Sequence, residues 1–262
     1  MDSKWKIPLY KIFTDKEDID CVSKVIRRGR DWAIGPEIPE FEKLLGNYVG
    51  TKYCVAFNSG TSALHAALIA AKVSKYDEII TPSFTFISTS NSILMASAKP
   101  KFVDIEKTHL GLDPNHIENN ITKKTKAIIP VHYAGLPCKI EEITKLAKRK
   151  KLLLIEDAAE SLGSHVNKKM IGTFGDMAIF SFAGNKVMTT GEGGAIVTDS
   201  KFYSERLKLI RSHGRSENSS YFSSIDNPNY ISLGYNWRMS SITAALAISQ
   251  LHKLDKLIKL RR

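Results

Sequence analysis

The chain has 262 residues, 43% of them hydrophobic and 25% charged, a composition that excludes a disordered or fibrous protein. Its apolar runs fall short of the roughly 20 residues that a membrane span needs. Its three cysteines, Cys21, Cys54 and Cys138, are widely spaced, which disfavours a disulfide framework or a zinc site and favours the cytoplasm. The formal charge of +11 suits any polyanionic partner, whether nucleic acid, anionic lipid or a diphosphate metabolite, and charge alone does not choose among them. The basic residues follow helical faces without interleaved aromatics, and we expect neither a nucleic-acid nor a membrane partner.

Short apolar, β-branched runs alternate with longer segments of helical period. This pattern predicts an α/β fold with a mostly parallel seven-stranded sheet and helices on both faces. The expected strands are 53–57, 78–82, 101–105, 127–131, 152–157, 178–182 and 195–199. The expected helices are 15–28, 37–48, 61–72, 86–96, 140–150, 201–212 and 240–260, the last with Ser240 or Ser241 as its cap.

The first candidate site is the segment YCVAFNSGTSALHAAL, in which a strand turns directly into a helix. Free backbone N–H groups and the positive helix end would point to one place near Gly60, Thr61 and Ser62, an arrangement that suits a phosphate. Gly60 permits a close approach. The alternative is an ordinary strand-to-helix turn with a serine or threonine cap.

The second candidate site is the segment LLLIEDAAESLG, which places Glu156 and Asp157 at the carboxyl end of a strand. Open α/β sheets bind ligands at this edge. Adjacent side chains of a strand face opposite sides, so only one of the two acids can face the ligand. That acid could bind a metal, a ribose hydroxyl or a protonated ring nitrogen; alternatively both acids cap a following helix.

The third candidate site is the segment AIFSFAGNKVMTTGEGGAIVT, where Ser181 ends a strand and Lys186 follows in an apolar, glycine-rich setting. Burial of a lysine favours its neutral amine, which can attack a carbonyl carbon. The alternative is a structural lysine paired with an acid such as Glu192. One cofactor, pyridoxal 5′-phosphate (PLP), needs a phosphate cradle, an acid for its ring nitrogen and an amine together, so the three segments jointly predict a PLP enzyme.

These segments resemble the DegT/DnrJ/StrS family of sugar-nucleotide aminotransferases, in particular its perosamine synthase-like members. The resemblance covers nearly the whole chain through NSGTSALHAAL, TPSFTFIST, IEDAAESLGS, SFAGNK, TTGEGG and LGYNWRM. It implies the fold-type I architecture of aspartate aminotransferase. The family usually has a larger residue at the position of Ala183, and some relatives that act as dehydratases have histidine at the position of Lys186.

The resemblance also implies a role for each matched residue. Lys186 matches the Schiff-base lysine, and Asp157 matches the acid that pairs with the ring nitrogen. The phosphate cradle matches Gly60, Thr61, Ser62 and Ser181. Phe86 matches the ring stacked on the cofactor, although Phe84 and Phe86 could both be core residues, and Glu160 lies near the phenolic oxygen. Asn236 matches an asparagine that reaches the phosphate of the neighbouring subunit in a homodimer with shared active sites.

The implied reaction is amino transfer, with glutamate as donor, to a nucleotide-linked 4-keto-6-deoxy sugar for surface-glycan biosynthesis. A PLP sugar enzyme acting at C3 and a non-enzymatic regulatory relative stay open. A dinucleotide-binding oxidoreductase is disfavoured because NSGTSAL lacks the GxGxxG spacing. We expect a large PLP-binding domain over 1–240, and over 241–262 a connecting helix into a small C-terminal domain that is truncated here.

Overall fold

A computed structural model describes residues 7–216 and 229–262 of the chain. Its helices are α1 (Lys16–Arg28), α2 (Glu37–Val49), α3 (Gly60–Ala70), α4 (Ser88–Met95), α5 (Pro114–Asn120), the 3-10 turn η1 (Tyr133–Gly135), α6 (Ile140–Lys150), α7 (Lys201–Arg211), α8 (Ser241–His252) and α9 (Leu254–Arg261). Its strands are β1 (Tyr53–Phe57), β2 (Glu78–Thr81), β3 (Lys99–Phe102), β4 (Thr125–Ile128), β5 (Leu153–Asp157), β6 (His165–Val166), β7 (Lys169–Met170), β8 (Met177–Ser181) and β9 (Gly194–Thr198).

Seven strands form one sheet in the order β1-β9-β8-β5-β4-β2-β3. The pairs from β8 to β3 are parallel, whereas β9 runs antiparallel to both β1 and β8. The mostly parallel seven-stranded sheet predicted from the sequence is therefore confirmed. Because β9 reverses beside β8, the connection over 182–193, which carries Lys186, stays at the edge where β5 and β8 end.

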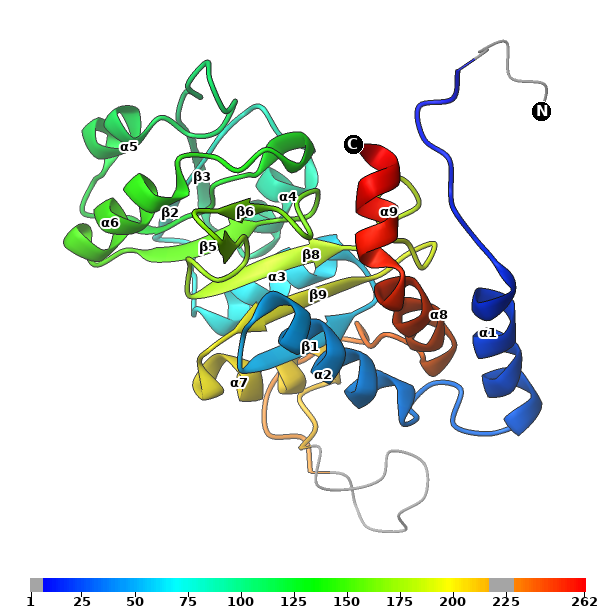
Figure 1. The fold of residues 1–262 in the computed structure, drawn as a ribbon. Coiled ribbons are helices and arrows are strands. Elements are labelled where there is room, and N and C mark those ends of the chain that lie inside the picture. Colours follow the sequence, from blue (N-terminus) through cyan, green and yellow to red (C-terminus); the bar gives the residue numbers. More distant parts are fainter. Residues whose placement is uncertain (1–6, 217–228) are drawn as a thin grey trace.

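Helices cover both faces of the sheet, as Figure 1 shows. Strand residues alternate between two hydrophobic cores: in β1, Cys54 and Ala56 face one core, whereas Val55 and Phe57 face the other. The first core includes α2, α6, α8 and α9, and the second includes α3 and α7. Full burial of each large apolar side chain contributes about 1.5–3 kcal/mol to the hydrophobic term.

Lys253 interrupts the helix expected over 240–260. The chain forms α8 up to His252 and α9 from Leu254, with Lys253 at φ −100° and ψ 1° between them. The Lys253 ammonium donates to Asp15 at 2.7 Å and to Asp18 at 2.8 Å, at the start of α1. The expectation of one continuous helix is wrong. The chain leaves helical geometry at Lys253, the residue whose ammonium bonds to α1.

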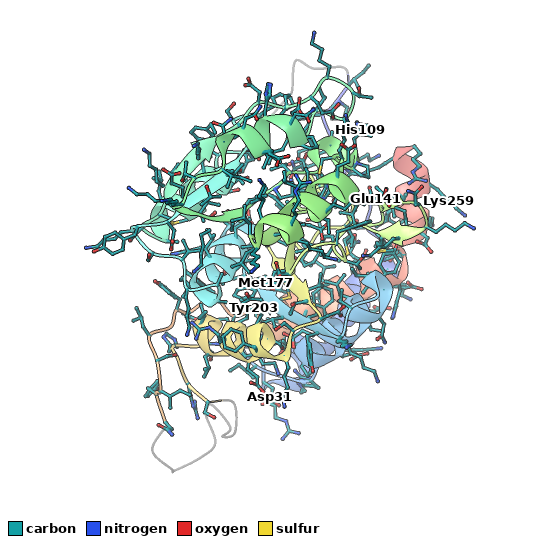
Figure 2. All side chains as sticks on the ribbon, turned by 90° about the vertical axis from the view of Figure 1, so that its left-hand side faces the viewer. Asp31, His109, Glu141, Met177, Tyr203 and Lys259 are labelled. Carbon is teal, nitrogen blue, oxygen red and sulfur yellow. The ribbon has the colours of Figure 1, made fainter. Side chains whose placement is uncertain are left out.

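The surface carries charged side chains, whereas the sheet interior is apolar. Figure 2 shows Lys259 of α9 projecting from the molecule, while Met177 of β8 is 1% exposed. Within the described ranges, no helix is both long and apolar enough to cross a bilayer.

Candidate active site

Asp157 ends β5 and is 4% exposed. Its carboxylate accepts hydrogen bonds from the Thr89 hydroxyl at 2.8 Å and the Ala159 N–H at 3.2 Å. Burial raises the pKa of Asp157 above its usual value, although these two bonds and the positive charge of Lys186 oppose the rise. A buried carboxylate of this kind gains from a cationic partner, such as a protonated ring nitrogen.

Glu156, the neighbouring acid, faces the opposite side of the sheet. It is fully buried and accepts hydrogen bonds from the backbone N–H groups of Gly172, Phe174 and Gly175. Phe174 and Gly175 donate to one oxygen, and Gly172 donates to the other, which also lies 3.2 Å from the His132 ring nitrogen. Glu156 therefore holds a turn in place, and the alternative that both acids cap a following helix is wrong, because 158–163 form turns.

The predicted phosphate cradle lies at the start of α3, which has a serine cap, as the alternative of an ordinary strand-to-helix turn expects. The Ser59 hydroxyl caps the helix by accepting from the Ser62 N–H at 3.0 Å, and the buried Ser62 hydroxyl bonds within the same turn. This leaves the N–H groups of Gly60 and Thr61, in the first helical turn, without an acceptor in the helix. Two such N–H groups at a positive helix end can bind a phosphate.

Glycines allow the cradle to lie against the ends of β8 and β9. A Cβ added to Gly60 would lie 2.9 Å from the Ser181 Cβ, and one added to Gly194 would lie 2.6 Å from the Gly60 nitrogen. Neither position accepts a side chain without movement of the backbone. Ser181 is thereby placed directly beside the cradle, and Ile179, two residues before it, pairs with Asp157 across the strands.

Lys186 reaches the same edge from the connection between β8 and β9. Its ammonium lies 3.1 Å from Glu160, and its side chain is 14% exposed. The other oxygen of Glu160 accepts from the Ala134 N–H at 2.8 Å. The structure thus pairs Lys186 with Glu160 and not with Glu192, the partner considered as an alternative.

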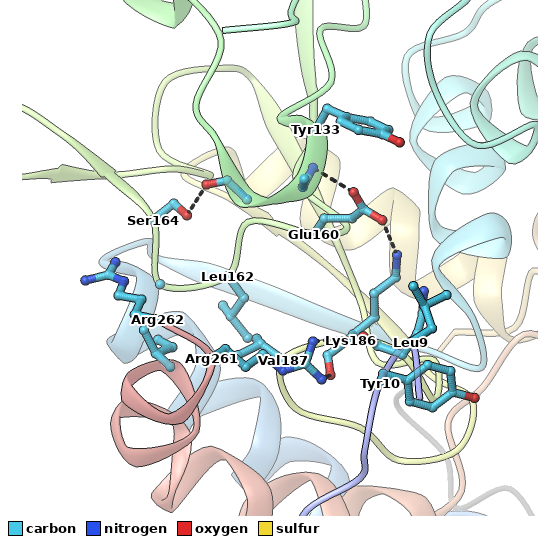
Figure 3. A pocket seen from close by; sticks show the side chains of 15 residues that line it. Leu9, Tyr10, Tyr133, Glu160, Leu162, Ser164, Lys186, Val187, Arg261 and Arg262 are labelled. Atoms are coloured by element: carbon cyan, nitrogen blue, oxygen red, sulfur yellow. Dashed lines mark hydrogen bonds and ion pairs between the residues drawn. The ribbon is translucent and has the colours of Figure 1, made fainter. Parts of the chain in front are cut away.

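A cavity of about 580 Å³ opens around Lys186 and Glu160 (Figure 3). Its lining combines an N-terminal segment, η1, the turn after β5 and the end of α9: Leu9, Tyr10, Tyr133, Ala134, Gly135, Glu160, Leu162, Gly163, Ser164, Asn185, Lys186, Val187, Ile258, Arg261 and Arg262.

Phe86 lies outside the hydrophobic core. It is 72% exposed and Phe84 is 40% exposed, so the alternative of two core residues is wrong. Phe84 packs against Tyr133, with ring centroids 4.3 Å apart. Phe86 precedes α4, whose Thr89 binds Asp157, so an exposed aromatic ring stands three residues from a contact of the buried acid.

Asn236 lies next to the cradle of its own chain through its backbone. The Asn58 side chain donates to the Asn236 carbonyl at 3.5 Å, and the Asn58 N–H donates to the Trp237 carbonyl at 2.9 Å. Tyr235 and Trp237 stack on each other at 3.9 Å and pack on the second core. The Asn236 side chain between them is exposed.

Sequence reasoning missed three contributors: Thr89, Tyr133 and Arg261. Thr89 stands in the quoted TFIST segment, and a threonine one helical turn after an exposed aromatic was a weak signal. Tyr133 and Arg261 gave no local signal, because their positions depend on how η1 and α9 pack.

The residues present fit PLP. The start of α3 with Ser181 offers an anion site, Asp157 is a buried acid with a raised pKa, and Lys186 presents an amine to the cavity. These three features lie at one edge of the sheet, as the cofactor requires.

The comparisons with known proteins point the same way. GDP-perosamine synthases from Caulobacter vibrioides and Escherichia coli O157:H7 are 42% and 37% identical to the chain, over 86% and 98% of it. The chain spans 58% and 68% of their lengths.

Solved structures confirm the predicted fold-type I architecture. Helicobacter pylori PseC, an aminotransferase involved in the biosynthesis of pseudoaminic acid, matches with a TM-score of 0.88 at 34% identity, over 95% of this chain and 66% of its own. Bacillus subtilis NtdA, solved with bound cofactor PMP, matches with a TM-score of 0.87 at 30% identity, over 96% and 57%. PMP is the amino form of PLP. The NtdA structure therefore holds the cofactor that the sequence predicts for this family. The DegT/DnrJ/EryC1/StrS aminotransferase family model matches residues 13–262, and the chain therefore belongs to that family.

Proposed function

We propose that the chain forms the cofactor-binding part of a PLP-dependent aminotransferase. The amino group would pass from glutamate to a nucleotide-linked 4-keto-6-deoxy sugar used in surface-glycan biosynthesis. The observation that carries this proposal is the position of Lys186, 14% exposed at a cavity and 3.1 Å from Glu160, at the sheet edge where Asp157 ends β5. The names of the two perosamine synthases support the sugar class.

When bound, PLP supplies an electron sink for the carbon that carries the amino group. Asp157 would hold a proton on the ring nitrogen, because a cation there would offset the cost of its own burial. The N–H groups of Gly60 and Thr61 would bind the phosphate, and Phe86 would cover the ring. Lys186 would carry a proton to and from the reacting carbon, while Glu160 holds its amine in the cavity.

We also propose a homodimer with shared sites, supported by the exposed side chain of Asn236 beside the cradle. A cytoplasmic location is supported by three free cysteines. The division into a large domain over 1–240 and a connecting part over 241–262 remains part of the proposal, although α8 and α9 pack on the same core as α2.

The first test is covalent trapping at Lys186. The full-length protein is incubated with PLP, reduced with borohydride and digested, and mass spectrometry should place the cofactor on the peptide that contains Lys186. Lys186→Ala should show no such label and should lose at least about 1000-fold in turnover, because it lacks both amine and proton carrier. Cofactor trapped on another lysine, with turnover retained in Lys186→Ala, would contradict the proposal.

The second test identifies the substrate. Glutamate and a panel of nucleotide-linked 3-keto and 4-keto sugars are supplied, and NMR locates the new nitrogen. Amination at C4 of a 6-deoxy sugar is the expected result. Amination at C3 would move the assignment to the alternative regiochemistry, and no transfer from glutamate, with salt-dependent DNA binding, would favour a regulatory relative.

A further inference from the structure

α9 contacts the backbone of the connection that carries Lys186. The guanidinium of Arg261 donates to the Asn185 carbonyl at 3.1 Å and to the Lys186 carbonyl at 2.6 Å. These are charge-assisted bonds to two consecutive carbonyls. Figure 3 shows Arg261 beside the backbone of Lys186, at the end of the lysine side chain opposite to Glu160.

α9 is itself fixed to the rest of the molecule. Leu254 is fully buried and Leu257 is 4% exposed, both in the first core. The Tyr48 hydroxyl donates to Asp255 at 2.9 Å. Ile258 packs over Gly163, where an added Cβ would overlap its side chain. Arg261, one turn further, therefore projects from a rigid support.

The two carbonyls belong to the peptide planes on either side of the Lys186 Cα. The Asn185 carbonyl lies in the preceding plane and the Lys186 carbonyl in the following one. Since each peptide unit is planar, holding both planes restricts φ and ψ of Lys186. The direction of its Cα–Cβ bond follows from these two angles.

We propose that Arg261 is a positioning residue that aims the Lys186 amine into the cavity. Glu160 fixes the amine end of the side chain and Arg261 fixes its backbone end. This inference rests on the proposed function for its catalytic consequence, but the orientation of Lys186 can be measured without turnover. Because Arg261 also lines the cavity, the competing role is direct contact with the phosphates of a nucleotide sugar.

The test compares Arg261→Met and Arg261→Lys with a matched control, Lys259→Met. Lys259 lies on the same helix, is exposed and is not among the residues that line the cavity; Figure 2 shows it projecting from the molecule. The cofactor-free full-length proteins are labelled briefly with an amine-reactive acylating reagent. Mass spectrometry then gives the extent of labelling of Lys186 relative to the exposed Lys145 on α6.

We expect Arg261→Met to raise this ratio about threefold or more, because a loosened connection lets Lys186 leave Glu160. Arg261→Lys, which can bond one carbonyl at a time, should fall between wild type and Arg261→Met, and Lys259→Met should match wild type. In the loaded enzyme, kcat should fall about 10- to 100-fold while KM for the nucleotide sugar changes less than about twofold.

An unchanged labelling ratio in Arg261→Met with a KM raised tenfold or more would overturn the inference and assign Arg261 to substrate phosphates. If Arg261→Met does not fold, as judged by circular dichroism, the ratio in Arg261→Lys decides alone: a wild-type ratio overturns the inference. Should the wild type fail to aminate any sugar, the proposed function fails, yet the labelling comparison still tests the positioning role.

Discussion

The two adjacent acids of β5 have different roles: Asp157 belongs to the proposed site, whereas Glu156 stabilises a turn. Asp157 is buried with two neutral hydrogen-bond donors, and its pKa is raised by burial. Glu156 is buried with three backbone donors and His132. A carboxylate with a raised pKa destabilises the folded state once the pH exceeds its usual value near 3.8, because the folded chain resists its ionisation.

We therefore expect opposite effects from the two isosteric substitutions in the cofactor-free protein at pH 7. Asp157→Asn removes an unfavourable buried charge and should raise Tm by about 2–4 °C, the shift that about 1 kcal/mol causes in a domain of this size. Glu156→Gln loses acceptors for buried N–H groups and should lower stability by about 1–3 kcal/mol. Differential scanning calorimetry measures both.

The effects on turnover should be the reverse of those on stability: Asp157→Asn should be the more damaging of the two substitutions. Asp157→Asn should bind PLP but lose at least about 100-fold in kcat, since a neutral amide does not hold a proton on the ring nitrogen. Glu156→Gln, once folded, should keep kcat within a few-fold of wild type. A Tm that falls in Asp157→Asn together with near-normal kcat would remove the role assigned to this acid.

At the scale of elements, the short apolar runs predicted the strands, and the glycine-rich turns after them predicted the candidate sites. The seven strands lay close to their predicted positions because their apolar residues face one of two cores. β3 begins at Lys99, two residues before the expected strand, because it is an edge strand with little burial and tolerates Pro100. The expected helix over 86–96 also shortened to α4, which leaves Phe86 outside it.

The α5 helix and the β6–β7 hairpin have local sequence signals that the predicted elements did not include. α5 begins with Asp113 as cap and Pro114 in the first turn, a recognised helix start. The β6–β7 hairpin turns through Asn167 and Lys168, both at positive φ, as a two-residue turn of this kind requires. In contrast, the break at Lys253 and the contact of Arg261 with the lysine connection depend on tertiary packing alone, which no local pattern records.

The α1–α8 junction gives a prediction for acid stability. Burial alone would raise the pKa of Asp18, but hydrogen bonds from Lys253 and Ser249 lower it below the usual 3.8. A carboxylate whose pKa is lowered stabilises the fold above its usual value, and this contribution is lost as the pH falls through the folded-state pKa.

Lys253→Met should thus cost about 1–3 kcal/mol in the free energy of unfolding at pH 7, because Asp18 loses its cation. The difference from wild type should begin to shrink as the pH falls below 3.8, where Asp18 of the unfolded chain takes up a proton, and it should vanish below the lower folded-state pKa. Urea unfolding at pH 7 and pH 3 measures both values, with Lys259→Met as the control on the same part of the chain. A difference that stays constant with pH would show that Asp18 is not the partner that matters.

At the scale of the whole molecule, the exposed side chain of Asn236 bears on the proposed homodimer. Tyr235 and Trp237 stack with each other and lie near His65 of α3, with the Trp237 ring 5.1 Å from His65. Their packing turns Asn236 outward. In the proposed homodimer this places an amide of one subunit at the cradle of the other.

Mixing two inactive variants tests this arrangement. Lys186→Ala and Asn236→Ala, unfolded and refolded together, should recover roughly one quarter of wild-type activity, because about half of the dimers are mixed and one of their two sites is whole. A mixture of Lys186→Ala and Asp157→Asn should recover nothing beyond its components, since both changes affect the same subunit's site. No recovery in the first mixture would place Asn236 in the site of its own chain.

The hydrogen bond from Asn58 to Trp237 spans most of the polypeptide, and Gly194 packs beneath the same turn. During synthesis the proposed phosphate site at the start of α3 therefore stays incomplete until residues near 237 have left the ribosome. A nascent chain stalled before that point would hold β1, α3 and β9 without the loop that completes their turn, and in the proposed enzyme we expect coenzyme loading to come late in the maturation of the protein.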